Sequence, residues 1–153
     1  MEQYLIGAIA VGEESLKHIH SPIMVGNMVM YKTILGTTQE QDWQLFYQRL
    51  QGNSSQSQKQ SMVNFLFDNY LRGADVDEQR LIKSMEVIEK QGYDVDYLDV
   101  ANKVYNSKRQ DRAIVFFRKF VEVTAKDDPR VPKLLQDLAA AGHMDWVEQL
   151  QTD

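Results

Sequence analysis

Acidic and histidine side chains near the N-terminus are the first candidates for metal or proton chemistry. Glu14 and His18 are four residues apart, and His20 follows two residues later. On an α-helix, residues two apart point in nearly opposite directions, so His18 and His20 are not expected to bind one metal ion together. A di-metal carboxylate site needs Glu-x-x-His pairs from two helices, and neither Glu13 nor Glu14 has a histidine three residues later. The pattern predicts no metal site here.

A second acidic cluster lies in the stretch YDVDYLD, which contains Asp94, Asp96 and Asp99. A calcium-binding EF-hand loop needs an oxygen ligand at its fifth position, glycine at its sixth and glutamate at its twelfth. Those positions hold Leu98, Asp99 and Tyr105. We therefore expect Asp94 to cap the start of a helix, with the neighbouring carboxylates favouring the positive end of its dipole.

The remaining residue types give no pattern typical of catalysis. The chain has no cysteine, which excludes disulfides, thiolate metal sites and cysteine nucleophiles. It has neither a G-x-S-x-G nucleophile motif nor a G-x-x-x-x-G-K phosphate loop. His143 follows Gly142 and is expected to assist a helix terminus. We predict a protein that is not an enzyme and that uses no metal or cofactor.

Composition limits the class of protein. A length of 153 residues favours one domain, and 43% hydrophobic with 25% charged residues is ordinary for a globular chain. A net charge of −5 disfavours general binding to a phosphate backbone. The apolar segment Leu5 to Val11 has no basic residue before it and an acidic pair after it, unlike a secretory signal. We expect a cytoplasmic protein.

The most apolar segment is SPIMVGNMVMYKTILG, residues 21–36. Its apolar part, interrupted by Asn27 and Lys32, is too short to cross a bilayer of about 30 Å. Ser21 before Pro22 is a helix start, and Gly36 is a suitable stop. This pattern predicts a central helix that neighbours enclose on every side.

Start signals and apolar spacing predict further helices along the chain. Thr38 with Gln41 has capping-box spacing, Asp75 with Glu78 starts another helix, and Asp128 before Pro129 repeats the cap-plus-proline start. A low-complexity stretch near residues 53–60 is expected to form a mobile loop. The residues expected to face inward are Trp43, Phe46, Tyr47, Leu50, Val63, Leu66, Phe67, Tyr70, Leu81, Met85, Ile88, Tyr97, Val100, Ala101, Val104, Ala113, Phe116, Phe117, Phe120, Leu134, Leu135, Leu138, Trp146, Val147 and Leu150.

These segments predict an all-α fold of seven or eight helices, with sequence neighbours antiparallel. Alternate helix starts are separated by about 35 residues, which is typical of stacked helical hairpins. An irregular helical bundle with ordinary helix lengths gives similar spacing, so both architectures stay open.

Residues 97–123 resemble a tetratricopeptide repeat (TPR). The matching positions are the large aromatic Tyr97, Val100, the small Ala101, the pair Ala113 and Ile114, and the aromatic Phe117. Small residues at facing positions let two helices approach, and aromatics fill the space between hairpins. The segment departs from the family at Phe120, where alanine is preferred, and at Ala125, where the repeat ends in proline. The resemblance covers about one repeat.

The resemblance implies a groove lined by the first helix of each hairpin. In the matched window the implied groove positions are Leu98, Asn102, Tyr105 and Asn106. Asn102 stands where clamp-type members of the family place an asparagine that binds peptide backbone or carboxylate. Arg130 and Lys133 are expected to supply positive charge from the next helix. The expected function is a non-enzymatic adaptor or regulatory module that binds a peptide or partner helix.

Two other functions remain open from the sequence. The stretches EVIEKQGYDVDYLDVANKVY and LLQDLAAAGHMDWVEQL also resemble pentatricopeptide repeats, which read single-stranded RNA. The acidic balance counts against an RNA groove, which is normally basic. A homodimeric helical assembly factor is the third interpretation, with two copies meeting over an apolar patch.

Overall fold

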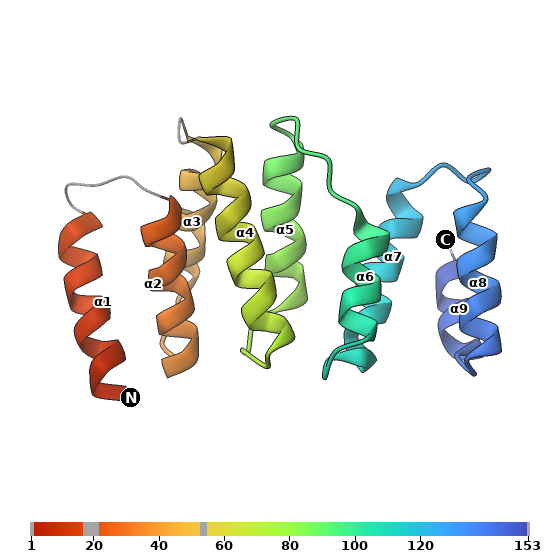
Figure 1. Cartoon of the computed structure of the whole chain (residues 1–153), viewed down its shortest axis with the longest axis horizontal. Helices are drawn as coiled ribbons and strands as arrows, with labels where there is room; N and C mark the ends of the chain where they lie inside the picture. Colours follow the sequence, from red (N-terminus) through yellow and green to blue (C-terminus); the bar gives the residue numbers. More distant parts are fainter. Residues whose placement is uncertain (1, 17–21, 53–54, 153) are drawn as a thin grey trace. The chain divides into compact units, whose positions relative to one another are not determined.

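A computed structural model describes residues 2–16, 22–52 and 55–152, and every regular element within these ranges is a helix (Figure 1). The helices are α1 Glu2–Leu16, α2 Pro22–Leu35, α3 Glu40–Gln51, α4 Gln56–Leu71, α5 Glu78–Glu89, α6 Tyr97–Tyr105, the 3-10 turn η1 Gln110–Arg112, α7 Ala113–Val123, α8 Arg130–Ala140 and α9 Met144–Gln151. The all-α prediction is confirmed. The described residues form nine α-helices instead of seven or eight, because residues 2–16 make a helix of their own.

The chain forms two compact units, residues 1–95 and 96–153. Helices α1 to α5 belong to the first unit and α6 to α9 to the second. The expectation of one domain, which rested on chain length, stays a prediction.

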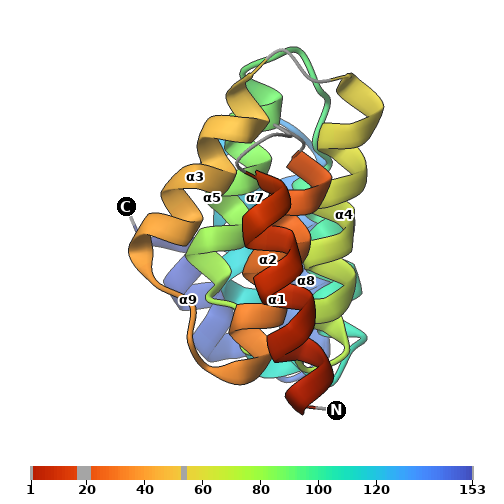
Figure 2. The same ribbon diagram turned by 90° about the vertical axis from the view of Figure 1, so that its left-hand side faces the viewer.

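Helix α2 lies at the centre of the first four helices and contacts α1, α3 and α4 (Figure 2). Its buried side chains are Val25, Met28, Val29 and Met30. Gly26 allows α4 to approach closely, because a Cβ atom at this position would collide with the side chain of Met62. Helix α5 completes the unit by packing on α3 and α4. The prediction that residues 21–36 form a central helix is confirmed for Pro22–Leu35.

The prediction that neighbours enclose α2 on every side is wrong. Ile34 is 53% exposed, and Met24 and Tyr31 are only partly buried. Three neighbouring helices cannot cover the full circumference, so part of α2 borders an open groove with α1. Over the described residues, no helix combines the length and apolarity needed to cross a membrane.

Helix ends follow the predicted chemistry but several starts are shifted. Gly36 ends α2 with a φ of 71°, a left-handed conformation that glycine adopts without strain. Asp77 and Asp96, two residues later than predicted, accept hydrogen bonds from the first turns of α5 and α6. Asp75 and Asp94, the predicted caps, carry the same carboxylate acceptors as Asp77 and Asp96, so the residue type alone does not show which aspartate caps the helix. Ser21 lies outside the described residues.

The predicted capping box of α3 is also shifted. The Gln39 amide donates to Asp42, 2.9 Å away, and α3 begins at Glu40. Thr38 instead shares a 2.8 Å hydrogen bond with Thr33. A loop was predicted near residues 53–60. Residues 53 and 54 lie outside the described residues, Ser55 caps α4, and residues 56–60 are helical.

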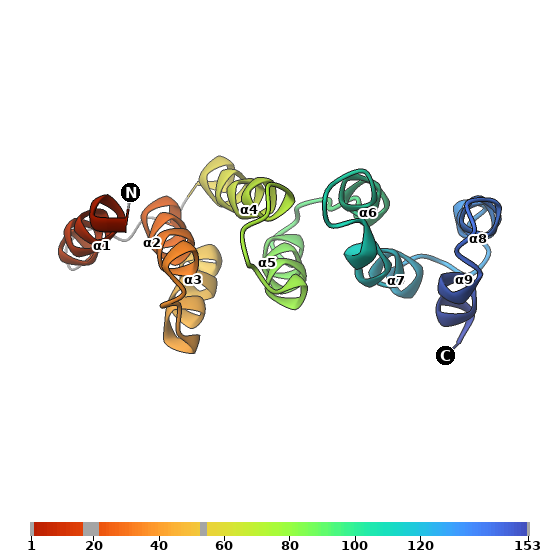
Figure 3. The same cartoon turned by 90° about the horizontal axis from the view of Figure 1, so that it is seen from below.

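The second unit pairs α6 with α7 and α8 with α9, and α7 also contacts α9 (Figure 3). Ala101 and Ala113 are fully buried where α6 meets α7, and Phe116 and Phe117 fill the interior beside them. Nearly all the residues expected to face inward are buried in the two units. Val100 and Leu135 are the exceptions, and both are partly exposed.

Candidate functional site

A pocket of about 380 Å³ opens between α6 and α8 in the second unit. Leu98, Asn102 and Tyr105 line it from α6, at the i, i+4, i+7 spacing that places side chains on one helix face. Arg130 and Lys133 line it from α8. Five of the six predicted partner-binding residues therefore border one cavity.

Asn106, the sixth residue, does not line this pocket. Helix α6 ends at Tyr105, and Asn106 is its exposed C-cap. The Asn106 backbone amide donates to the Asn102 carbonyl, 3.0 Å away. The pocket lining does not include Asn106, so its role in partner binding stays a prediction.

The sequence did not mark the other side chains that complete the pocket. Phe117 of α7 and Leu134 and Leu138 of α8 provide apolar surface, and they were expected only as core. Asp137 adds the one carboxylate in the lining. It lies four residues after Lys133 on α8, so helical spacing from the predicted cation could have identified it. The pocket combines apolar side chains with a few polar groups, as sites for small molecules do.

The Arg130 guanidinium at the pocket is held by Asp128. Two guanidinium nitrogens, Nη2 and Nε, donate to the two carboxylate oxygens at 2.9 and 3.1 Å. The same carboxylate accepts a hydrogen bond from the Arg130 backbone amide at 2.9 Å. Hydrogen bonding to Arg130 lowers the pKa of Asp128 from its ordinary value, and the pKa of Arg130 is raised by the same bond. The guanidinium also lies 5.4 Å from the centre of the Phe120 ring.

Lys133 is the more exposed cation. Its ammonium lies 3.1 Å from Asp137 in an i,i+4 ion pair, and its side chain is 73% exposed. An exposed pair of this kind contributes about 0.5 kcal/mol or less to stability, so the ammonium can turn toward another anion at little cost. The lining thus holds two cations and one carboxylate.

An aromatic cluster supports the wall of the pocket at Tyr105. The Tyr105 hydroxyl hydrogen-bonds to His143 Nε2 at 3.1 Å. The His143 ring stacks on Trp146 with ring centres 4.2 Å apart. His143 is the N-cap residue of α9, and it assists the helix ends through its backbone: its amide donates to the Leu138 carbonyl of α8 at 2.9 Å, and its carbonyl accepts from the Val147 amide of α9 at 3.1 Å. The His143 ring thus contacts both Tyr105 of α6 and Trp146 of α9.

Carboxylates of the acidic stretch YDVDYLD make contacts within α6. The described residues contain no cluster of three or more histidine, cysteine or acidic side chains that could hold a metal ion. Asp96 serves as the N-cap of α6, and Asp99 forms an i,i+4 ion pair with Lys103. His18 and His20 lie outside the described residues.

Comparison with protein families, curated proteins and solved structures finds no match to this chain.

Proposed function

We propose that the second unit is a non-enzymatic protein-interaction module, an adaptor or regulator, and that its pocket holds a carboxylate-bearing peptide or helix of a partner protein. The observation that carries this proposal is the position of Asn102 and Lys133. They come from different helices, yet they border the same partly apolar pocket. Such pockets bind apolar side chains inside and fix orientation through polar groups at the edge.

Lys133 gives the pocket a cation that can hold an acidic group of the partner. Arg130 is already paired with Asp128, and Lys133 has the more exposed ion pair, with Asp137. A carboxylate between Asn102 and Lys133 would receive hydrogen bonds from an amide and an ammonium, and bonds to charged groups are the stronger kind. Lys133 can take part because its present ion pair is exposed and weak.

The packing of α6 on α7 supports the finer proposal that the fold is a stack of TPR-like hairpins. Ala101 and Ala113 are fully buried, as small residues are where two helices approach closely. Tyr97 and Phe117 are buried at the large aromatic positions of the resemblance. Under this proposal, α8 and α9 form the following hairpin, and the groove lies along α6 and α8. We propose a cytoplasmic location.

Affinity capture from native lysate, with and without nuclease, tests the function. The bait is wild-type protein, the Asn102→Ala/Lys133→Ala variant, or the matched control Lys103→Ala, which removes an exposed α6 ammonium outside the pocket lining. We expect a protein that survives nuclease treatment, is retained by wild type and Lys103→Ala, and is lost by the double variant. Partners that need nucleic acid, or that the double variant retains equally, would contradict the proposal.

A further inference from the structure

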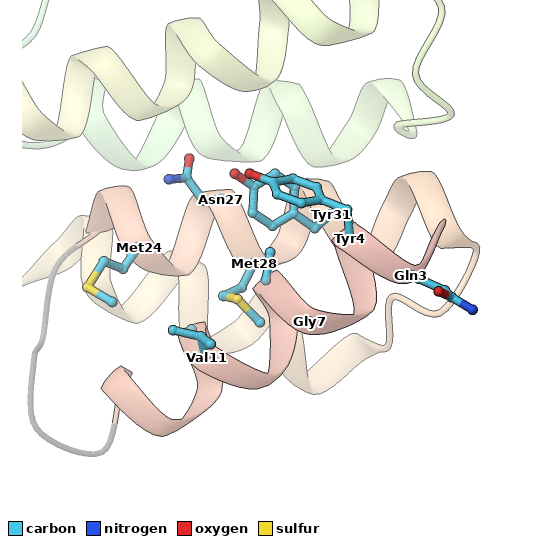
Figure 4. Close-up of a pocket in the computed structure, with 10 residues that line it drawn as sticks. Gln3, Tyr4, Gly7, Val11, Met24, Asn27, Met28 and Tyr31 are labelled. Atoms are coloured by element: carbon cyan, nitrogen blue, oxygen red, sulfur yellow. The ribbon is translucent and has the colours of Figure 1, made fainter. Parts of the chain in front are cut away.

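Two pockets of the protein differ in the charge of their linings. The groove between α1 and α2 in the first unit has a volume of about 570 Å³, and no charged side chain lines it (Figure 4). The lining of the α6/α8 pocket in the second unit includes Arg130, Lys133 and Asp137. Of the two, the α6/α8 pocket therefore has the means to favour one ligand over another by charge.

The inner surface of the α6/α8 pocket is apolar. Phe117, Leu134 and Leu138 line it and are only 1%, 7% and 4% exposed, and their side chains carry no hydrogen-bond donor. The Tyr105 hydroxyl, which belongs to the same lining, already hydrogen-bonds to His143. A carboxylate that entered this space would lose its water without gaining a donor, which is costly. The part of a ligand that enters is therefore apolar.

The polar side chains of the lining lie at the mouth of the pocket. Asn102, Lys133 and Asp137 are all exposed residues. The Lys133 ammonium lies 3.1 Å from the Asp137 carboxylate, and the two side chains are 73% and 64% exposed. A ligand carboxylate can thus reach Lys133 from the solvent side and keep part of its hydration.

Asp137 competes with such a ligand for Lys133. The two residues are one turn apart on α8, at the i,i+4 spacing that lets their side chains meet. A ligand carboxylate bound to Lys133 would lie close to the Asp137 carboxylate, and the two like charges would repel each other. Asp137 must therefore turn into solvent when an acidic ligand binds. Because one exposed ion pair replaces another, the exchange alone contributes little to binding.

We propose that Asp137 determines the specificity of the α6/α8 pocket, which accepts a short partner segment with a large apolar residue next to an aspartate or glutamate. The apolar side chain enters over Leu134 and Leu138, and the neighbouring carboxylate replaces Asp137 on Lys133. Burial of the apolar side chain provides the favourable free energy that the exchange of ion pairs lacks. The volume of about 380 Å³ is near the lower end for ligand pockets, which favours one large side chain over a helix face. This inference rests on the proposed function of the same pocket.

NMR titration of the ¹⁵N-labelled full chain with three capped tetrapeptides tests the proposal. Between two glycines, the first peptide carries Trp-Glu, the second Trp-Gln and the third Ala-Glu. We expect Trp-Glu to shift amide signals of α6 and α8. Its dissociation constant should be about threefold lower than that of Trp-Gln and about tenfold lower than that of Ala-Glu. Equal constants for Trp-Glu and either other peptide, shifts confined to other helices, or no binding would overturn the proposal.

Matched variants test the role of Asp137. Asp137→Asn removes the competing charge, so it should tighten Trp-Glu about threefold more than Trp-Gln. Asp99→Asn is the control, because Asp99 forms the same i,i+4 pair with Lys103 on α6 and does not line the pocket. It should change the binding of neither peptide, and circular dichroism checks that both variants fold. Weaker binding of Trp-Glu to Asp137→Asn, or equal tightening in Asp99→Asn, would overturn the proposal.

Failure of this inference and failure of the proposed function are distinguishable. If the peptides are not discriminated but Asn102→Ala/Lys133→Ala still loses a captured partner, the function stands and the role of Asp137 is overturned. If the peptides behave as expected but no protein is captured, the preference of the pocket stands and the adaptor function is overturned. Free indole-3-acetate that binds more tightly than Trp-Glu would assign the pocket to a small-molecule acid and overturn the proposal.

Discussion

The Tyr105 hydroxyl of α6 lies 3.1 Å from Nε2 of His143, the residue before α9. Tyr105 also lines the pocket between α6 and α8, and its ring contacts Phe117 and Trp146 edge-to-face. His143 and Trp146, which do not line the pocket, therefore support Tyr105 in its wall. We therefore expect the hydrogen bond between Tyr105 and His143 to stabilise the second unit.

Removing that hydroxyl should weaken the second unit. Tyr105→Phe keeps the ring and loses the hydrogen bond, so the free energy of unfolding should fall by about 1 kcal/mol. The measurement is urea unfolding followed by tryptophan fluorescence. Tyr93→Phe is the matched control, because the buried Tyr93 hydroxyl has no hydrogen-bond partner among the described residues and its removal should be neutral or stabilising. An equal loss in both variants would contradict a specific role for His143.

Close packing of α2 on α4 depends on Gly26. Gly26→Ala would push its Cβ into the side chain of Met62, which is only 2% exposed, so the variant should lose about 1–3 kcal/mol of stability. Gly7→Ala is the control, since a Cβ there meets no atom within 4 Å. Alanine is the better helix former, so Gly7→Ala should be stabilising by up to about 1 kcal/mol. Thermal unfolding by circular dichroism compares them, and an unchanged Gly26→Ala would contradict the packing.

Buried Lys59 connects three helices of the first unit. Its ammonium donates to the Gly52 carbonyl after α3 and to the Gln91 side chain after α5. Lys59→Met keeps the apolar stem but removes both bonds, so chemical unfolding should show a loss of about 1–3 kcal/mol. Lys90→Met, at an exposed site, should change stability by less than about 0.5 kcal/mol. A stable Lys59→Met would mean that burying the charge costs as much as its bonds contribute.

The Asp128–Arg130 pair predicts a pH dependence. Because hydrogen bonding to Arg130 lowers the folded-state pKa of Asp128, the pair stabilises the fold above the ordinary aspartate pKa. That contribution disappears as pH falls through the lowered pKa. NMR titration of Asp128 should show this pKa below the ordinary range in wild type and closer to it in Arg130→Ala. The same pKa in both proteins would show that Arg130 does not hold the carboxylate.

Much of the interior could be predicted because helical spacing and burial are coupled. Phe46, Leu66 and Phe117 lie on three different helices. Each belongs to a set of apolar residues that share one face of its own helix, and each is buried as expected. Helix starts were less certain. Asp94 and Asp96 both precede α6, and only the path of the backbone selects Asp96 as the cap.

Residues whose role depends on distant partners could not be predicted. Lys59 lies in a polar, low-complexity stretch, and its burial follows from Gln91, which no local pattern connects to it. His143 was expected to assist a helix terminus, and the hydrogen bond of its side chain to Tyr105 of α6 was not expected. The positions of Asn102 and Lys133 at one pocket were expected from the TPR resemblance, but their role in binding stays a prediction.

The most direct test of the proposed function is the dissociation constant of the captured partner, measured for four forms of the protein. These are wild type, Asn102→Ala, Lys133→Ala and the control Lys103→Ala. We expect binding about tenfold weaker for Asn102→Ala and Lys133→Ala, because each removes a donor to the bound carboxylate, and unchanged binding for Lys103→Ala. The same constant for all four forms would contradict a binding site between α6 and α8.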